Sequence, residues 1–336
     1  MEMKEAIQKT VEKQDLSHEE AFSVAQTIMQ GKATDAQIAG LLVALRLKGE
    51  TVDEITGFAR AMREEAIQVP CSANELVDTC GTGGDRSRTF NVSTLAALVA
   101  GGAGCKVAKH GNRSVSSQCG SADCLLELGV NLEVSPEVMA RCIDENGVGF
   151  LFAPLLHKAM KYAIGPRREI GIRTIFNVLG PLTNPAGAKR QLLGVFDEAL
   201  TESLAKVLKN LGSEHVWVVH GDGLDEITTT GPTKVTELKQ GTIRTFSIEP
   251  EEFGFQRVHK EALLGGDAKT NAKIALDVLS GKPGPTRDVV VLNAGAVIYV
   301  AGMASSIQEG IEMAKESIDS GKAMEKLEML RKITKN

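Results

Sequence analysis

Aromatic residues are scarce in this chain, which has one tryptophan, two tyrosines and ten phenylalanines among its 336 residues. Binding by stacking against rings is therefore a poor expectation. The six cysteines include no Cys-x-x-Cys pair, which argues against a disulfide scaffold and against a structural zinc site. Positive charge is not in excess, because the formal net charge is -5. A general nucleic-acid-binding surface is unexpected, so any phosphate must be bound at a local site.

Long apolar runs are also missing. The longest, from Leu95 to Gly104, is far shorter than the ~18 residues that a membrane-spanning helix needs. The N-terminal residues show no hydrophobic signal core, so we expect no export and a reducing, cytoplasmic location. Glycine, by contrast, is plentiful: its 34 residues are about a tenth of the chain, against a usual ~7%. A chain rich in glycine and poor in aromatic residues is expected to bind a polar ligand through its backbone amides.

The first 66 residues carry a purely helical pattern. A capping-box sequence begins each of three predicted helices, at Ser17, Thr34 and Thr51, and apolar residues follow at helical spacing. A unit of this size buries little surface alone. We therefore expect residues 1–70 to form a helical subdomain that packs on the rest of the chain or on another subunit.

From residue 75 onward, short β-like runs alternate with helical stretches, which predicts an α/β domain with a mostly parallel sheet. The expected strands are Glu75–Asp78, Cys105–Ala108, Val148–Phe152, Gln191–Phe196, His215–Val219 and Val289–Leu292. The expected helices include Ser93–Val99, Gly120–Leu128 and Pro136–Asn146, and Thr233–Ile248 is expected to add a hairpin. The segment Pro166–Pro185 has a helical pattern and is expected to join the helical subdomain. The α/β domain then covers residues 75–165 and 190–336.

A glycine-rich loop follows the first expected strand. It runs Asp78-Thr-Cys-Gly81-Thr-Gly-Gly84-Asp85 and continues through Thr89-Phe-Asn91-Val92-Ser93-Thr94 into an apolar helix. A strand, a glycine loop and a polar helix start present free amides and hydroxyls to an anion. The loop is not a dinucleotide fingerprint, because Arg86 stands where a glycine is needed, and the chain has no P-loop sequence. A purely structural turn before a capped helix remains the alternative.

A second polar loop follows the apolar run Cys105–Ala108. It runs Lys109-His110-Gly111-Asn112-Arg113-Ser114-Val115-Ser116-Ser117, and Gly120-Ser121-Ala122-Asp123 then begins a helix. Cations, an amide and hydroxyls suit phosphate oxygens and a carboxylate. In open α/β sheets, ligands bind at the carboxyl ends of the strands, which is where this loop lies. A solvated basic loop is the alternative.

Adjacent carboxylates follow another expected strand, at Asp225-Glu226. A pair of this kind is a plausible magnesium seat, because Mg²⁺ prefers a few protein oxygens together with substrate phosphates. A solvated acidic loop is the alternative.

Arginine follows Gly165-Pro166, where a helix is expected to begin. A cation is unfavourable at a helix N-terminus, so Arg167 is a candidate to bind a substrate carboxylate; a surface arginine paired with Glu169 is the alternative. His157 could line a pocket, although a partly buried helical histidine is the simpler interpretation.

In their order and spacing, these motifs resemble the anthranilate phosphoribosyltransferase family of tryptophan biosynthesis, over essentially the whole chain. The glycine loop is shared with pyrimidine nucleoside phosphorylases, whereas Lys109-His-Gly-Asn-Arg113 and Gly165-Pro-Arg167 are specific. One departure is Lys158, where the family usually has proline. The resemblance implies the nucleoside phosphorylase/phosphoribosyltransferase fold, a hinge between the two parts and a homodimer assembled through the helical subdomain.

The same resemblance implies transfer of phosphoribosyl from 5-phospho-α-D-ribose 1-diphosphate to the amine of anthranilate. It assigns the donor to Gly81, Gly84, Asp85, Thr89, Asn91, Val92, Ser93, Thr94, Lys109, His110, Gly111, Asn112, Arg113, Ser114, Val115, Ser116, Ser117 and Ser121. It assigns anthranilate to Gly81, His110, Asn112, His157 and Arg167. It assigns Mg²⁺, as two ions per subunit, to Ser93, Asp225 and Glu226.

This reaction fits the residues without any catalytic acid–base pair. Breaking the C1–O bond places negative charge on diphosphate, which amides and metal ions can stabilise, and the aromatic amine is already neutral. A pyrimidine nucleoside phosphorylase is the nearest rival, although Asp225-Glu226 and Asn112-Arg113 argue against it. A non-catalytic nucleic-acid-binding relative is a second rival, which the net charge of -5 disfavours.

Overall fold

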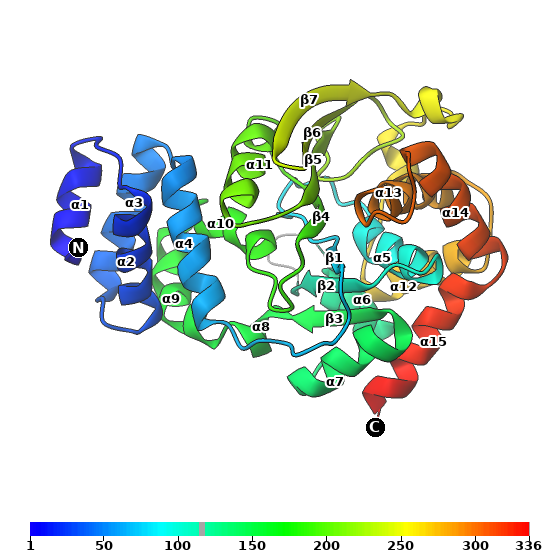
Figure 1. Ribbon diagram of the computed structural model, residues 1–336, viewed down its shortest axis with the longest axis horizontal. Coiled ribbons are helices and arrows are strands. Elements are labelled where there is room, and N and C mark those ends of the chain that lie inside the picture. The colour runs from blue at the N-terminus through cyan, green and yellow to red at the C-terminus, as the bar shows by residue number, and fades with distance from the viewer. Residues whose placement is uncertain (114–117, 336) are drawn as a thin grey trace.

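The computed structural model describes residues 1–113 and 118–335, which form a helical unit beside a larger α/β unit (Figure 1). The helical unit contains α1 (Met3–Val11), α2 (His18–Met29), α3 (Asp35–Lys48) and α4 (Val52–Glu65). The three predicted capping boxes are confirmed: the side chains of Ser17, Thr34 and Thr51 each accept a bond from the backbone N–H three residues on.

Helices from the middle of the chain lie against this unit. Helix α9 (Lys161–Ile170) packs on α3, and the short α10 (Phe176–Leu179) packs on α4. Ala163 and Phe176 belong to the same apolar core as the side chains of α1 to α4.

Arg167 does not begin a helix, so that prediction is wrong. Helix α9 begins at Lys161, and Arg167 falls in its last turn, where the helix dipole favours a cation. The sequence is misleading here because a proline is typical of the first helical position, whereas Pro166 lies inside α9.

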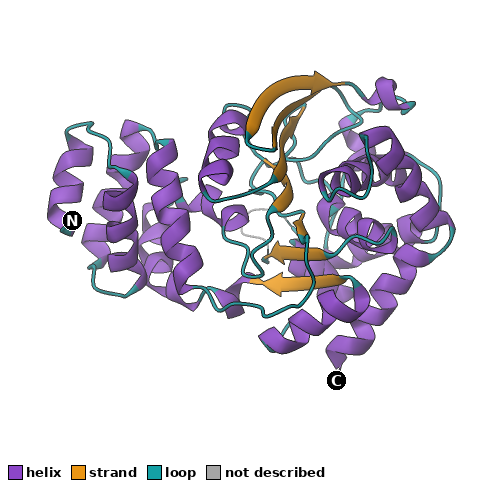
Figure 2. Ribbon diagram, viewed as in Figure 1, coloured by secondary structure: helices purple, strands orange, loops and turns teal. Residues whose placement is uncertain are grey.

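The α/β unit is built on one sheet, in which the described residues form strands in the order β3-β2-β1-β4-β5-β6-β7 (Figure 2). The strands are β1 (Val77–Asp78), β2 (Val107–Gly111), β3 (Val148–Phe152), β4 (Arg190–Gly194), β5 (His215–Gly221), β6 (Thr233–Lys239) and β7 (Thr242–Ile248). Strands β1 to β5 are parallel, while β6 and β7 form an antiparallel hairpin. The predicted fold class, mostly parallel α/β with a helical N-terminal part, is confirmed.

Helices cover both faces of this sheet. Along β5, Trp217 and Val219 belong to one apolar core, whereas the alternating Val216 and Val218 belong to the core of the helical unit. Helix α11 (Leu200–Asn210) packs on β5 and also on α4, so it connects the sheet to the helical unit. The other face packs against α5 (Val92–Gly102), α7 (Pro136–Arg141), α13 (Pro285–Val300) and α15 (Lys322–Lys335). Around these helices lie α6 (Ser121–Glu127), α12 (Ala268–Leu279) and α14 (Ile307–Asp319).

The expected strand Val289–Leu292 is wrong, because these residues lie in α13. Every residue from Val289 to Val300 is buried, so this helix has no polar face and its sequence lacks helical periodicity. The expected helix Pro136–Asn146 is split into α7 and a π-helical turn. The remaining short helices are that π turn (Cys142–Asn146), α8 (Ala153–Leu156) and the 3₁₀ turns Lys158–Met160, Gly180–Leu182, Pro250–Phe253 and Lys260–Leu263.

The length and composition of the helices show whether one of them could cross a membrane. None of the helices within residues 1–113 and 118–335 combines the length and apolar character that crossing a bilayer requires.

Candidate active site

The loops that follow β1, β4 and β5 meet at one edge of the sheet. The Thr82 N–H donates to the Gly194 carbonyl at 2.9 Å, which ties the β1 loop to the end of β4. The Gly83 N–H donates to the Asp225 carboxylate at 2.7 Å, which ties the same loop to the residues after β5. This edge holds the carboxyl ends of parallel strands, where open α/β sheets bind their ligands.

Glycine is required in the β1 loop by close approach and by backbone conformation. A Cβ on Gly81 would lie 3.0 Å from the Gly194 carbonyl oxygen and 3.2 Å from an Asp225 carboxylate oxygen. Gly83 and Gly84 have φ angles of 63° and 79°, in the left-handed region. Arg86 adopts φ of 65° in the same loop, although it is not glycine. Non-glycine residues seldom adopt this conformation, and they concentrate at functional sites.

Three carboxyl groups converge beside this loop. The Asp225 N–H donates to Asp85 at 3.3 Å, and Glu226 is the next residue along the chain. Burial and the neighbouring Asp85 charge raise the pKa of Asp225 to about 7. Burial and the Asp225 charge also raise the pKa of Glu226 well above its ordinary value, against the opposing effect of Lys109. Three acidic groups held together in this way favour a bound cation.

These carboxyl groups suit Mg²⁺ better than a metal ion that takes all of its ligands from protein side chains. Among the described residues, no cluster of three or more His, Cys, Asp or Glu side chains is arranged to hold a metal ion. Mg²⁺, however, normally takes one or two protein carboxylates and completes its shell with water and substrate phosphates. Asp225 and Glu226 provide two such carboxylates, beside a loop and a helix start that suit substrate phosphates.

The N-terminus of α5 points into the same region. The Asn91 side chain does not cap this helix, because its amide donates to the Cys119 carbonyl at 3.3 Å and its oxygen accepts from Asn271 at 3.0 Å. The backbone of Ser93 instead lowers the pKa of Glu226, in opposition to burial, so this carboxyl lies near the start of the helix. An uncapped helix N-terminus carries free N–H groups and partial positive charge, so it attracts anions.

Lys109 lies buried beneath the loop. Its ammonium donates to the Thr79 hydroxyl at 3.0 Å, to the Thr79 carbonyl at 3.3 Å and to the Ser93 hydroxyl at 3.2 Å. These bonds use the donor capacity of the ammonium to connect β1, β2 and α5. Lys109 therefore supplies a fixed positive charge next to the carboxyl groups.

The loop after β2 is described as far as Arg113. The Asn112 carbonyl accepts from the Ser121 hydroxyl and from the Ala122 N–H, both at 3.2 Å, which places the start of α6 beside this loop. The Arg113 guanidinium carbon lies 6.0 Å from the centre of the Phe152 ring. A Cβ on Gly111 would lie 2.6 Å from the Phe150 ring, so a larger residue would displace the strand end. The predicted site residues Ser114, Val115, Ser116 and Ser117 lie outside the described residues.

Two histidines predicted for the acceptor lie together. The Nε2 atoms of His110 and His157 are 3.2 Å apart, and Nδ1 of His110 lies 3.0 Å from the Gly180 carbonyl oxygen. Because a carbonyl only accepts, His110 carries its proton on Nδ1 and accepts from His157 at Nε2. Burial lowers the pKa of His110 to about 3 and that of His157 to about 4, so both rings are neutral at pH 7.

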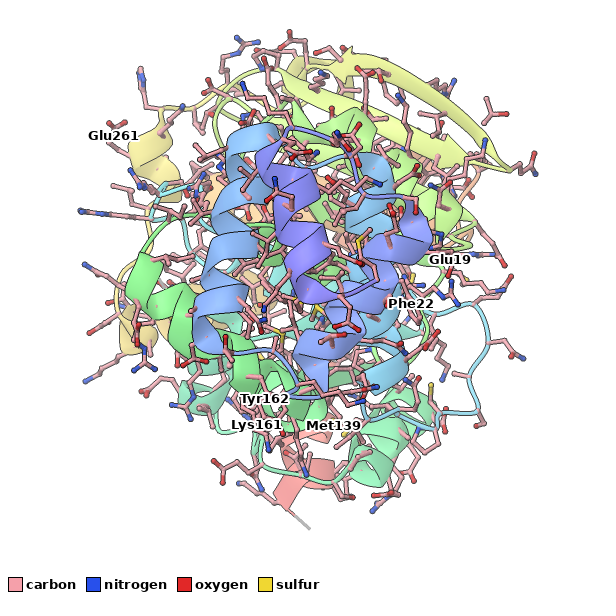
Figure 3. All side chains as sticks on the ribbon, turned by 90° about the vertical axis from the view of Figure 1, so that its left-hand side faces the viewer. Glu19, Phe22, Met139, Lys161, Tyr162 and Glu261 are labelled. Carbon is pink, nitrogen blue, oxygen red and sulfur yellow. The ribbon has the colours of Figure 1, made fainter. Side chains whose placement is uncertain are left out.

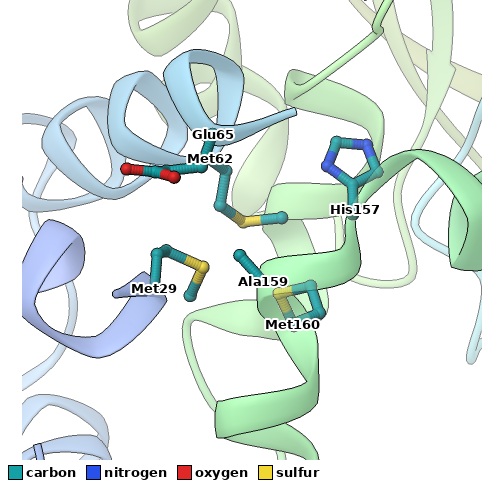
Figure 4. Close-up of a pocket in the computed structure, with 6 residues that line it drawn as sticks. All are labelled: Met29, Met62, Glu65, His157, Ala159 and Met160. Carbon is teal, nitrogen blue, oxygen red and sulfur yellow. The ribbon is translucent and has the colours of Figure 1, made fainter. Parts of the chain in front are cut away.

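His157 also faces a small pocket between the helical unit and the turn Lys158–Met160. Figure 4 shows the Met62 side chain of α4 reaching toward this ring, with Met29 on the opposite side of the pocket, whereas the Glu65 carboxylate points away from the ring. His157 therefore lies where the two parts of the chain meet.

Arg167 reaches the same boundary from α9. Its guanidinium carbon lies 5.2 Å from the centre of the Phe176 ring, and burial lowers its pKa. The described residues provide no ion pair to Glu169, so the alternative of a surface pair is not observed. A half-buried guanidinium on a ring face keeps its donors available for a carboxylate.

Some predicted donor residues contribute backbone rather than side chain. The side chains of Val92 and Thr94 are buried in the core, and the Thr94 hydroxyl has no hydrogen-bond partner among the described residues. Thr89 lies at the end of the loop, where its hydroxyl is 3.1 Å from that of Ser87.

Buried polar side chains support these loops from below, a role that the sequence did not predict. Asp78 accepts from the His110 N–H at 3.1 Å and from the Asn184 amide at 2.7 Å, and burial raises its pKa to about 6. The Gln191 amide donates to the carbonyls of Cys80 and Pro181, at 3.2 and 2.9 Å. A polar residue inside an expected buried strand was the signal that could have identified Asp78 and Gln191.

Comparison with known proteins agrees with both parts of the fold. Residues 73–324 match a family model described as "Glycosyl transferase family, a/b domain", and residues 4–66 match "Glycosyl transferase family, helical bundle domain".

Curated relatives match the chain over nearly its full length. An anthranilate phosphoribosyltransferase of Moorella thermoacetica is 58% identical, and the match covers 98% of this chain and 97% of that protein. The enzyme of the same name from Alkaliphilus metalliredigens is 56% identical over 99% of this chain and 98% of its own length.

Solved structures show the same fold. Anthranilate phosphoribosyltransferase from Thermus thermophilus superposes with a TM-score of 0.94 at 45% identity, over 98% of this chain and 99% of that one. The enzyme from Saccharomyces cerevisiae in complex with PRPP and Mg gives a TM-score of 0.90 at 30% identity, over 99% and 98% of the two chains. The chain belongs to the anthranilate phosphoribosyltransferase family.

Proposed function

We propose that this protein transfers the phosphoribosyl group of 5-phospho-α-D-ribose 1-diphosphate to the amine of anthranilate. The products are N-(5-phosphoribosyl)anthranilate and diphosphate, within tryptophan biosynthesis. The observation that carries the proposal is the meeting of a glycine loop, an uncapped helix N-terminus and three carboxyl groups at one sheet edge. Curated relatives with this activity in their names are 53–58% identical to the chain.

The donor binds at the loop after β1 and the N-terminus of α5. The backbone amides of Gly81 and Gly84 and those at the start of α5 bind its phosphate oxygens, while the Thr82 and Gly83 amides hold the loop in place. Lys109 and Arg113 add positive charge. The donor site comprises Gly81, Gly84, Asp85, Thr89, Asn91–Thr94, Lys109–Ser117 and Ser121. Asp225, Glu226 and the Ser93 hydroxyl hold magnesium, as two ions per subunit. Bound magnesium neutralises the negative charge that the diphosphate gains as it leaves.

Anthranilate binds where the helical unit meets the sheet edge. Arg167 takes its carboxylate, since a guanidinium binds a carboxylate through two parallel hydrogen bonds. Asn112 and the Gly81 backbone line the remaining contact surface. The neutral rings of His110 and His157 present no charge to compete with Arg167 for that carboxylate.

Catalysis rests on position and electrostatics. The anthranilate amine is neutral at pH 7 and needs no strong base to attack C1 of the ribose. The residues of the chain hold the amine and C1 in line and fix positive charge at the leaving diphosphate. Because the site draws on both parts of the chain, we infer that residues 1–70 with 166–185 move as one body about a hinge.

The outer face of α3 supports a homodimer. Ala36, Gly40, Val43 and Leu47 follow one another at helical spacing on the side away from the α3 core contacts, and Leu47 is 80% exposed. Tyr162, on the adjoining α9, is visible on the side of the molecule that faces away from the sheet (Figure 3). A contiguous apolar face of this kind is usually covered by a partner, here a second copy.

Light scattering on the purified protein tests the dimer. We expect the mass of two chains for the wild type and of one chain for Leu47→Glu. A wild-type monomer at micromolar concentration would contradict the proposal. A cytoplasmic location is part of the same proposal, and fractionation of cells that express the protein checks it.

Loss of anthranilate fluorescence tests the activity. We expect a loss that requires both 5-phospho-α-D-ribose 1-diphosphate and Mg²⁺, and that stops when either is omitted. Folded protein that causes no loss would contradict the proposal. Phosphorolysis of thymidine or uridine, measured in parallel with phosphate, would then identify the protein as a pyrimidine nucleoside phosphorylase.

A further inference from the structure

Arg173 joins the helical side of the molecule to the glycine loop. It lies between α9 and α10, in the segment that packs on the helical unit. Its guanidinium donates to the Gly84 carbonyl and stacks on Phe196, with the guanidinium carbon 4.1 Å from the ring centre. None of the sequence motifs includes this residue.

The glycine loop needs support of this kind. Gly83 and Gly84 are both in the left-handed region and have no side chains to pack, so this backbone loses much entropy when it is ordered. At the end of β4, the Gly194 carbonyl accepts from the Thr82 N–H at 2.9 Å. After β5, the Asp225 carboxylate accepts from the Gly83 N–H at 2.7 Å. Arg173 holds the next residue, Gly84, from a third direction.

The chemistry of arginine suits this position. A planar guanidinium can donate to a carbonyl in its plane while its face lies on an aromatic ring. Phe196 is itself fixed, because its N–H donates to the Thr82 hydroxyl at 3.1 Å. Phe196, Arg173 and the loop therefore support one another through contacts between residues far apart in the sequence.

We propose that Arg173 is a positioning residue that holds Gly84 in the conformation that binds the phosphoribosyl donor. It also connects the donor loop to the segment that carries Arg167, the residue assigned to anthranilate. The inference rests on the proposed function and deepens it, because it names a determinant of donor affinity outside the donor site itself.

Steady-state kinetics of Arg173→Ala test the proposal. We expect the KM for 5-phospho-α-D-ribose 1-diphosphate to rise about tenfold, while kcat and the KM for anthranilate stay within about twofold. The anthranilate KM is spared because α9 packs on α3 independently of Arg173. Arg168→Ala is the matched control: this exposed arginine lies on α9 and should change none of the three constants.

Two further variants separate positioning from general stability. Arg173→Lys keeps the charge and a donor but lacks the planar face, so the donor KM should fall between wild type and Arg173→Ala. Phe196→Leu removes the ring and should raise the donor KM in the same direction, with an unchanged melting temperature.

Two results would overturn the proposal. One is a donor KM for Arg173→Ala equal to that of wild type. The other is a joint change of kcat and both KM values together with a lower melting temperature, which indicates a structural role. Failure of the proposed function is distinguishable from both, because the wild type would then show no transfer.

Discussion

Buried carboxyl groups lie near both ends of strand β5, and their surroundings shift their pKa values in opposite directions. Near the start of β5, Glu237 of the neighbouring β6 accepts from His215 at 3.1 Å, Trp217 at 2.9 Å, Tyr299 at 3.0 Å and Arg244 at 2.6 Å. Burial alone would raise the pKa of Glu237, but these donors outweigh it and lower the pKa to about 2.

Past the other end of β5, Asp225 and Glu226 receive fewer donors and face Asp85 instead. Their pKa values are raised, to about 7 for Asp225. Burial is common to both ends, so the number of donors and the charge of the neighbours make the difference. The carboxylate of Glu237 is matched by donors of the protein itself, whereas Asp225 and Glu226 lack such donors, in keeping with their proposed role in holding magnesium.

The largest expected effect comes from removing the acids at the site. Asp225→Asn combined with Glu226→Gln should lower the rate of phosphoribosyl transfer about a thousandfold or more, because the charge on the leaving diphosphate loses its metal. The metal-free variant should melt at the same or a higher temperature than wild type, since like charges are removed. Fluorescence kinetics and thermal melting measure the two effects. Full activity in Mg²⁺ would refute the metal assignment.

The opposite variant should show the opposite pattern. Glu237→Gln leaves its donors with a neutral partner and should lower the free energy of unfolding by about 2 kcal/mol. Its kcat should stay within about twofold of wild type, because Glu237 lies at the far end of β5 from the loops. Urea unfolding followed by the same activity assay checks both. A loss of activity without a loss of stability would contradict the division between the two ends.

Stability should respond to pH in opposite directions at the two ends. Asp225 binds its proton more tightly when folded, so its contribution to stability is present below its ordinary pKa of 3.8 and is lost as pH rises to about 7. Glu237 binds its proton less tightly when folded, so its contribution is present above 4.5 and is lost as pH falls toward about 2.

Chemical unfolding between pH 4 and 8 measures this response without metal. We expect the stability advantage of the Asp225→Asn/Glu226→Gln variant over wild type to grow as pH rises through this range. Mg²⁺ with the phosphoribosyl donor should abolish the advantage, because the bound cation replaces the missing proton. A difference that does not change with pH would show that Asp225 is not perturbed as described.

The smallest expected effect comes from backbone conformation. Arg86 in the glycine loop and Gln240 in the turn between β6 and β7 both have left-handed φ angles, 65° and 50°. Replacing either with glycine should change the free energy of unfolding by up to about 1 kcal/mol in the stabilising direction. Arg86→Gly should also raise the KM for the donor a few-fold, because the loop becomes less ordered, whereas Gln240→Gly should leave it unchanged. Equal changes of the donor KM in the two variants would contradict a specific role of the Arg86 conformation in donor binding.

Local signals made much of the fold predictable. Helix caps at Ser17, Thr34 and Thr51 and short β-like runs are encoded within a few residues, so the helical N-terminal part, the mostly parallel sheet and the hairpin followed from the sequence. The prediction of a strand at Val289–Leu292 was wrong because α13 is buried on all sides, so its sequence shows no helical periodicity. The predicted start of α9 was wrong because Pro166 resembles a helix-initiating proline, although it lies within the helix.

The site divides in the same way. Glycine loops, adjacent carboxylates and basic loops are visible as motifs, which is why Asp85, Asp225 and Lys109 were named before the fold was known. Asn184, Gln191 and Arg173 act through contacts with residues distant in sequence, and only the packed chain brings them to the loop. The pKa shifts could not be predicted either, since they depend on burial and on which charges become neighbours.

Calorimetric titration of the phosphoribosyl donor, with and without Mg²⁺, tests the difference between the two ends of β5 most directly. We predict Mg²⁺-dependent binding to wild type and to Glu237→Gln with similar affinity, and binding at least about fifty-fold weaker to Asp225→Asn/Glu226→Gln. Unchanged Mg²⁺-dependent affinity in that double variant would contradict this division, because the acids past the end of β5 would then have no part in holding the metal.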